Sequence, residues 1–138
     1  MSAASQSLSL PAAIESLAPA TEFVRDGARE AGFTGDRLGE VDLVMEELFM
    51  NVASYAYPAG EPGAVEITWS LPHPGVLSVE IADRGFAFDP LRGEDPDLTS
   101  ELSERPIGGL GIFLVRGMTS ALDYRRDGDW NRLHFEMS

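Results

Sequence analysis

The sequence predicts an α+β domain folded as a two-layer sandwich, with helices on one face of a mostly antiparallel, mixed sheet. Three observations lead to this fold class. Two helical patterns come first, two pairs of alternating segments follow, and the segments of each pair are joined by a turn rich in Pro, Gly or Asp. No internal repeat or linker divides the chain, so residues 1–138 are expected to form one domain.

The chain is expected to begin with a short strand over residues 7–10 and a first helix. The helical pattern starts after Pro11 and ends near Gly32. Pro19 interrupts this pattern, so the helix either kinks at Pro19 or begins there.

The second helix is expected to run from Asp36 to Tyr57, because Pro58 and the glycine-rich residues after it stop a helix. Its apolar residues recur at the spacing of three and four that marks one helical face. They are Leu38, Val41, Val44, Met45, Leu48 and Val52.

The second half of the chain predicts two hairpins on either side of a third helix. A polar segment over about 91–107 precedes that helix, and a connector of this length is usually functional or disordered. The expected elements are strands over 64–71 and 76–82, a helix over 107–119, and strands over 121–126 and 131–137.

The composition excludes several classes of function. The formal net charge is -13 and all ten basic residues are Arg, which argues against nucleic-acid binding. Without Lys the chain has no P-loop lysine and no Schiff-base lysine. Without Cys it has no disulfide or thiolate metal site, and two isolated histidines make a His-rich metal site improbable.

The sequence carries no sign of a membrane or secretory segment. No apolar run approaches the roughly 18 residues that span a bilayer. The first ten residues lack a basic region and a sustained apolar region. A cytoplasmic protein is expected.

The second helix carries the first candidate site residues, Glu47 and Asn51, one turn apart on the same flank of the apolar stripe. Glu46 leaves the helix on the opposite flank. Taken alone, Glu47 and Asn51 are best explained by a hydrogen bond between them. A carboxylate beside a carboxamide also suits one wall of a binding site.

Two further stretches stand in a consistent order behind this pair. Asp83 and Gly85 follow the second strand, where a carboxylate emerges at the edge of the sheet and a glycine permits a close backbone approach. Gly109, Leu110 and Gly111 open the third helix, whose N-terminal N–H groups favour phosphate. Alone, Asp83 could also be a turn-forming residue, and the glycine pair a tight turn.

The three stretches in this order resemble the N, G1 and G2 boxes of the GHKL ATPase superfamily. More closely, residues 38–137 resemble the stand-alone anti-sigma factor serine/threonine kinases of bacteria. The resemblance implies a Bergerat-type ATP-binding fold that uses ATP and Mg²⁺. It implies that Glu47 is the catalytic base, that Asn51 is the Mg²⁺ ligand, and that Asp83 accepts a hydrogen bond from the adenine amino group.

The remaining residues of the implied site bind the nucleotide. Gly85 lies in the G1 box, and Gly109, Leu110 and Gly111 form the G2 box. Arg105, in the segment over 91–107 that corresponds to a lid, is a candidate for reaching the γ-phosphate, although no motif fixes its position. The chain departs from the family pattern in having Ala87 in place of a second G1 glycine and Tyr55 in place of a histidine.

The resemblance implies a kinase that phosphorylates a small anti-sigma factor antagonist and binds a sigma factor, with a homodimer as a family-level expectation. A histidine kinase would need a phosphoacceptor histidine helix, and neither His73 nor His134 lies on one. The alternative is a nucleotide-gated binding module without kinase activity, consistent with Ala87, Tyr55 and the acidic lid. A metal-dependent hydrolase that uses Asp83 and Asp89 is less favoured, because a ligand cluster is missing.

Overall fold

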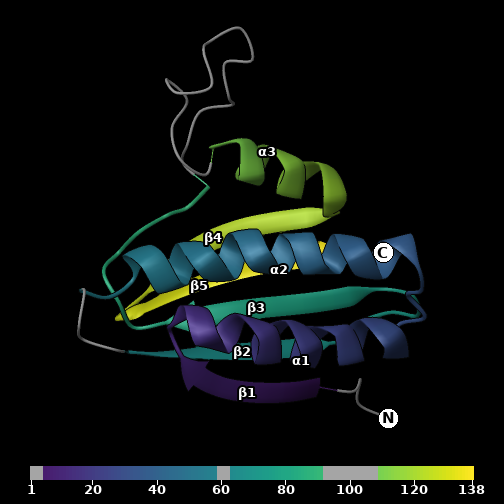
Figure 1. The fold of residues 1–138 in the computed structure, drawn as a ribbon, viewed down its shortest axis with the longest axis horizontal. Helices are drawn as coiled ribbons and strands as arrows, with labels where there is room; N and C mark the ends of the chain where they lie inside the picture. Colours follow the sequence, from purple (N-terminus) through teal and green to yellow (C-terminus); the bar gives the residue numbers. More distant parts are fainter. Residues whose placement is uncertain (1–4, 59–62, 92–108) are drawn as a thin grey trace, which may run out of the picture.

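The computed structural model describes residues 5–58, 63–91 and 109–138. Its elements follow the predicted order. They are β1 (Ser5–Pro11), the short 3₁₀ helix η1 (Ile14–Ser16), α1 (Leu17–Glu30), α2 (Asp36–Tyr55), β2 (Ala64–Ser70), β3 (Leu77–Asp83), α3 (Gly109–Met118), β4 (Ala121–Asp127) and β5 (Trp130–Met137) (Figure 1).

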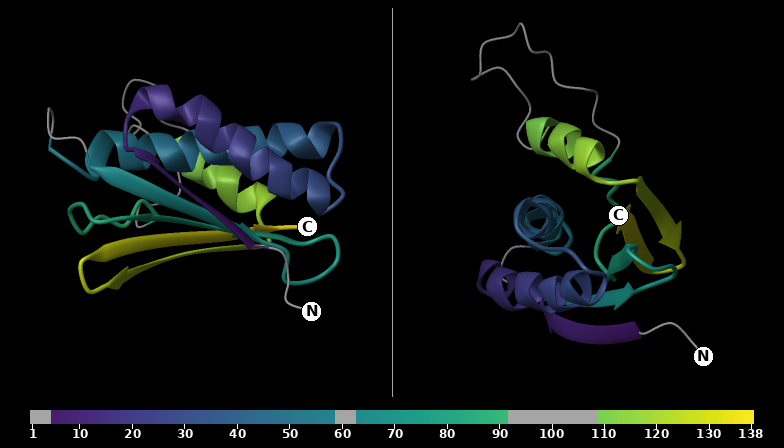
Figure 2. Two further views of the ribbon diagram at one scale, coloured as in Figure 1. Left: turned by 90° about the horizontal axis from the view of Figure 1, so that it is seen from below. Right: turned by 90° about the vertical axis from the view of Figure 1, so that its right-hand side faces the viewer.

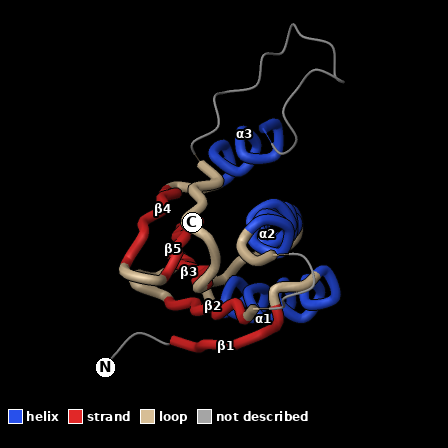
Figure 3. Tube along the Cα trace, turned by 90° about the vertical axis from the view of Figure 1, so that its left-hand side faces the viewer, coloured by secondary structure: helices blue, strands red, loops and turns tan. Residues whose placement is uncertain are grey.

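The strands form a five-stranded sheet in the order β1-β2-β3-β5-β4. Every pairing between neighbouring strands of this sheet is antiparallel. Helices α1, α2 and α3 lie on one side of the sheet (Figures 2 and 3). The two-layer α+β fold is therefore confirmed, but the sheet is antiparallel throughout rather than mixed.

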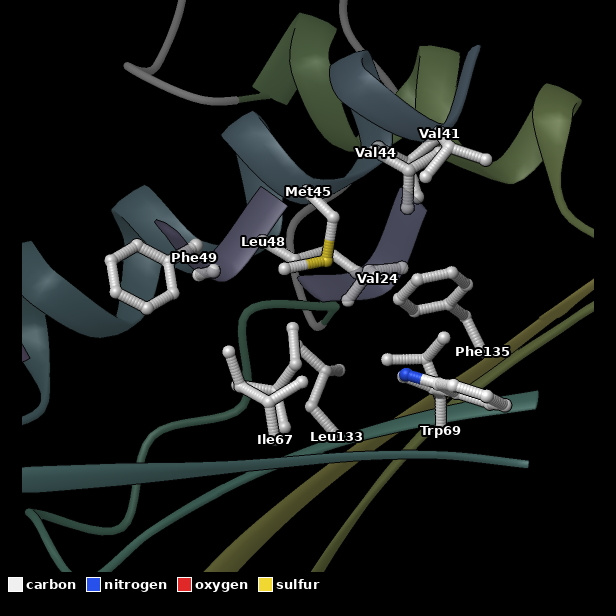
Figure 4. Close-up of a cluster of buried hydrophobic side chains, with 14 of the residues drawn as sticks. Val24, Val41, Val44, Met45, Leu48, Phe49, Ile67, Trp69, Leu133 and Phe135 are labelled. Carbon is white, nitrogen blue, oxygen red and sulfur yellow. The ribbon is translucent and has the colours of Figure 1, made fainter. Parts of the chain in front are cut away.

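The core lies between α2 and the sheet (Figure 4). The stripe predicted for α2 is buried from Val41 to Val52, and Leu38 at its start is partly buried. The facing layer comes from alternate residues of β2 and β5, including Ile67, Leu133 and Phe135. Packing of this face against the sheet fixes the rotation of α2 and so decides which way its polar residues point.

The helix boundaries have local causes. Pro19 is the third residue of α1, where the missing N–H would have no partner within the helix, so it does not kink the helix. α2 ends at Tyr55, three residues before Pro58. Gly128, with a φ of +59°, forms the turn between β4 and β5, which glycine adopts readily. In the described ranges, no helix combines the length and apolar character needed to cross a membrane.

Candidate functional site

The polar residues of α2 point to two different places. Glu47 and Asn51 are half-buried, whereas Glu46 is exposed. Glu46 lines a surface groove between α1 and α2 together with Arg25 and Asp42. The two adjacent glutamates therefore face different surroundings, as their positions on the helix predict.

Glu47 lies against the first turn of α3. A Cβ atom added to Gly111 would be 2.0 Å from both Cδ and Oε2 of Glu47, so a side chain at this position would displace the carboxyl group from its present place. Gly109 and Leu110 complete the same turn of backbone. The fold thus brings the predicted base and the predicted phosphate-binding turn together, although 64 positions separate Glu47 from Gly111 in the sequence.

The surroundings of Glu47 disfavour its charged form. Burial raises the pKa of the Glu47 carboxyl above its ordinary value, and the nearby Glu46 carboxylate adds to the increase. Hydrogen bonding to Asn51 makes no contribution to this shift, and no bond joins these two described side chains. The simple local explanation for the pair is therefore wrong.

Asp83 is the last residue of β3 and is only 3% exposed. Its Oδ1 accepts a hydrogen bond from the backbone N–H of Gly85 at 2.8 Å and another from Nδ2 of Asn131 at 2.8 Å. Both bonds from described residues therefore end on the same carboxylate oxygen. Burial of a carboxylate is tolerated where such donors surround it.

The loop after Asp83 is attached to the end of α2. The backbone N–H of Phe86 donates to the carbonyl of Ala56 at 2.7 Å, and that of Arg84 donates to the Tyr57 hydroxyl at 2.9 Å. A Cβ atom added to Gly85 would lie 1.9 Å from the Ala56 oxygen. These contacts therefore fix the position of the C-terminal end of α2, which carries Asn51, relative to the end of β3, which carries Asp83.

The other side of this loop is attached to the β4–β5 hairpin. Asn131 donates to the carbonyl of Phe86 at 2.7 Å, and Arg126 donates to the carbonyl of Gly85 at 2.9 Å. Oδ1 of Asn131 in turn accepts from Arg126 at 3.1 Å and from the Tyr124 hydroxyl. The backbone N–H groups of residues 84–86 and the carbonyls of residues 85 and 86 are thus all bonded within the protein.

A divalent cation would find hard oxygen ligands here but no protein cage. Within residues 5–58, 63–91 and 109–138, no group of three or more His, Asp or Glu side chains is arranged to hold a metal. Mg²⁺ usually takes one or two protein oxygens and completes its shell with water and phosphate. The half-buried amide of Asn51, one turn beyond Glu47 on α2, fits that limited role.

A comparison with protein families matches residues 10–137 to the histidine kinase-like ATPase domain. The chain belongs to this family. Its GHKL-type fold, inferred from the three sequence boxes, is thereby confirmed, and the order of those boxes was a sufficient signal for it.

Curated relatives of this ATPase domain are named as kinases. The chain is 36% identical over 91 residues to the serine/threonine-protein kinase BtrW of Bordetella bronchiseptica. The aligned region covers 66% of this chain and 63% of BtrW. It is 26% identical over 120 residues to the serine-protein kinase RsbW of Oceanobacillus iheyensis, covering 80% of this chain and 72% of RsbW. The matched region thus spans slightly less than two thirds of BtrW.

Solved structures support the same fold. The structure of the RsbU and RsbW domains of Rv1364c from Mycobacterium tuberculosis matches 97% of this chain and 32% of that chain, with a TM-score of 0.66 and 12% identity. The histidine kinase domain of the blue-light activated histidine kinase EL346 from Erythrobacter litoralis matches 88% of this chain and 59% of that chain, with a TM-score of 0.55 and 18% identity.

The ATPase domain places its predicted site residues in two groups. Glu47 lies against Gly111 where α2 meets α3, with Asn51 one turn further along α2. Asp83 and Gly85 lie at the end of β3. Arg105 and nearly all of the predicted lid over 91–107 lie outside the described residues. Tyr55, one turn beyond Asn51, packs its ring against Phe88 with the ring centroids 5.3 Å apart.

Sequence reasoning missed Asn131. The inward-facing positions of β5 are Asn131, Leu133, Phe135 and Met137, and all four are buried. An amide at the first inward position of an otherwise apolar face needs buried partners, because an unpaired buried amide is costly. That break in the alternation was the signal that could have identified it.

Proposed function

We propose that this ATPase domain is a serine/threonine protein kinase of the anti-sigma factor type. It would bind Mg²⁺ and ATP, phosphorylate a small antagonist protein and bind a sigma factor in the cytoplasm. The observation that carries the proposal is the contact between the Glu47 carboxyl and Gly111 in the first turn of α3. The names of the relatives BtrW and RsbW support the same activity.

Each end of the site has a proposed task in nucleotide binding. The first turn of α3 offers backbone N–H groups to the phosphates. The Asn51 amide oxygen would hold Mg²⁺, and the ion would supply positive charge that neutralises the phosphate oxygens. Asp83 accepts a hydrogen bond from the exocyclic amino group of adenine through the carboxylate oxygen that Gly85 and Asn131 leave free.

Glu47 is the proposed general base. It accepts the proton of the acceptor hydroxyl as the hydroxyl oxygen forms a bond to the γ-phosphorus and the bond from that phosphorus to the bridging oxygen breaks, releasing ADP. The raised pKa of Glu47 makes it a stronger base than an ordinary carboxylate. Glu46 is not in position for this task, because it faces the α1–α2 groove.

The second candidate is a nucleotide-gated binding module that captures a regulator without phosphorylating it. The observation that favours it is a set of exposed aromatic side chains next to the site. Tyr55, Phe86 and Phe88 are 45%, 60% and 39% exposed, respectively. Exposed apolar groups that lie together commonly mark a surface for a partner.

One pair of assays separates these candidates. Calorimetry with ATP, with and without Mg²⁺, tests nucleotide binding, and γ-labelled ATP with candidate antagonist proteins tests transfer. A kinase gives Mg²⁺-dependent ATP binding and a labelled antagonist. ATP-dependent complex formation without label supports the binding module, and absence of ATP binding contradicts both candidates.

A further inference from the structure

Asn131 is a buried amide whose hydrogen-bonding capacity is fully used. It is 4% exposed, and a carboxamide offers two N–H donors and two acceptor sites on its oxygen. The donors reach Oδ1 of Asp83 and the carbonyl of Phe86, and the oxygen accepts from Tyr124 and Arg126. No group of Asn131 is left over for a ligand.

The bonds of Asn131 act on Asp83 through one oxygen. Nδ2 of Asn131 and the Gly85 N–H both donate to Oδ1, each at 2.8 Å. Two donors on one oxygen fix the rotation of the carboxylate and leave Oδ2 as the acceptor for a ligand. The bond to the Phe86 carbonyl fixes the following loop at the same time.

We propose that Asn131 is a positioning residue that gives the site its selectivity for a purine with an exocyclic amino group. It does so by orienting Asp83, without touching the base. This inference rests on the proposed function, because it takes Asp83 as the acceptor for that amino group. It assigns the β4–β5 hairpin a part in base recognition.

An amide suits this position better than a carboxylate of the same shape. In Asn131→Asp, an oxygen replaces the nitrogen that faces Oδ1 of Asp83 and the Phe86 carbonyl, so oxygen meets oxygen at both contacts. Two carboxyl groups at this separation share a proton in preference to both ionising. The charged and titratable groups around the new carboxyl are Asp83 from β3, and Tyr124 and Arg126 from β4.

The test compares ATP with the triphosphate of purine riboside, which lacks the 6-amino group. Calorimetry gives the ratio of their dissociation constants for each variant at pH 8 and at pH 6. For the wild type we expect ATP to bind about tenfold more tightly or better, since the hydrogen bond involves a charged acceptor. In Asn131→Asp the ratio should fall towards one at pH 8 and recover partly at pH 6.

Tyr124→Phe is the matched control. It removes one bond to the oxygen of Asn131 but leaves both donors in place, so the wild-type ratio should persist. Asn131→Ser keeps the test valid if the Asp variant does not fold. The serine side chain is uncharged, and its hydroxyl provides one donor where the amide provides two. Its ratio should lie below that of the wild type.

The outcomes separate this inference from the proposed function. If the wild type prefers ATP and the Asn131→Asp or Asn131→Ser variant prefers it equally, the proposed role of Asn131 is overturned, but the proposed function is not. A wild type that binds both nucleotides equally overturns the assignment of Asp83 to the amino group, and with it the role of Asn131, but leaves the kinase proposal standing. A wild type that binds neither nucleotide overturns the proposed function as well.

Discussion

Gly85 and Gly111 lie at the two ends of the candidate site, and their surroundings differ in kind. A side chain at Gly85 would meet the backbone carbonyl of Ala56, whereas a side chain at Gly111 would meet the carboxyl end of Glu47. Backbone in a packed helix end cannot move away cheaply, but a flexible side chain can. The Asp83 end is therefore built as fixed structure, and the Glu47 end is adjustable.

Hydrogen bonding follows the same division. At the Asp83 end, the loop over 84–86 is bonded to α2 on one side and to the β4–β5 hairpin on the other. At the Glu47 end, none of the bonds between described residues involves the side chain of Glu47 or Asn51. Preorganised recognition at one end and groups free to engage phosphate and metal at the other are consistent with the proposed kinase.

Gly111→Ala tests the Glu47 end and should have the largest effect. The new methyl group displaces the Glu47 carboxyl, so the rate of phosphate transfer should fall about a hundredfold, the lower range for loss of a general base. Stability towards urea should change little. Gly117→Ala in the same helix, where nothing lies within 4 Å, should keep the wild-type rate. Equal rates for the two variants would contradict the proposed role of the contact.

Gly85→Ala tests the Asp83 end and should act mainly on stability. Forcing a methyl group against the Ala56 carbonyl should lower the free energy of unfolding by about 1–3 kcal/mol, measured by urea denaturation. Gly39→Ala in α2 meets open space and should leave stability unchanged or raise it by up to about 1 kcal/mol. If Gly85→Ala were as stable as Gly39→Ala, the claim that the backbone is rigidly packed at the Asp83 end would be disproved.

Tyr57→Phe removes one link between α2 and the loop after Asp83. The hydroxyl donates to the Ala64 carbonyl at 2.7 Å and accepts from the Arg84 N–H at 2.9 Å. Both bonds are exposed and water can replace them, so the loss in unfolding free energy should be about 1 kcal/mol or less. Tyr55→Phe is the control, because its ring contact with Phe88 remains. A loss as large as that of Gly85→Ala would contradict this ranking.

The pH dependence of stability should show the smallest effect. Because the folded state raises the pKa of Glu47, it binds that proton more tightly than the unfolded state. Stability is thus gained below the ordinary glutamate pKa and lost as the pH rises through the raised value. Urea denaturation across this range should show the wild type losing stability relative to Glu47→Gln as the pH rises. The opposite trend would contradict the assigned surroundings.

The sequence predicted most of the fold because its periodic patterns are local. The stripe from Val41 to Val52 defined α2, and the alternation around Ile67 defined β2. The sequence did not show that every pair of neighbouring strands is antiparallel. β3 pairs with β5, the last strand, and β5 runs antiparallel to β3 after the chain has passed through α3 and β4. That pairing depends on contacts distant in sequence, which local patterns do not contain.

The candidate site was only partly predictable, for the same reason. Glu47, Asn51 and Asp83 belong to local motifs, so their side chains could be placed from the sequence. Asn131 belongs to no motif, and its partners Asp83 and Phe86 lie more than forty positions earlier.

The central claim is that Glu47, and not its neighbour Glu46, serves the reaction. The most direct measurement compares phosphate transfer from Mg²⁺-ATP to the antagonist for Glu47→Gln and Glu46→Gln, with ATP affinity measured on the same preparations. We expect Glu47→Gln to bind ATP but lose transfer by about a hundredfold or more, and Glu46→Gln to remain near the wild type. Retained transfer in Glu47→Gln, or its loss in Glu46→Gln alone, would contradict the account.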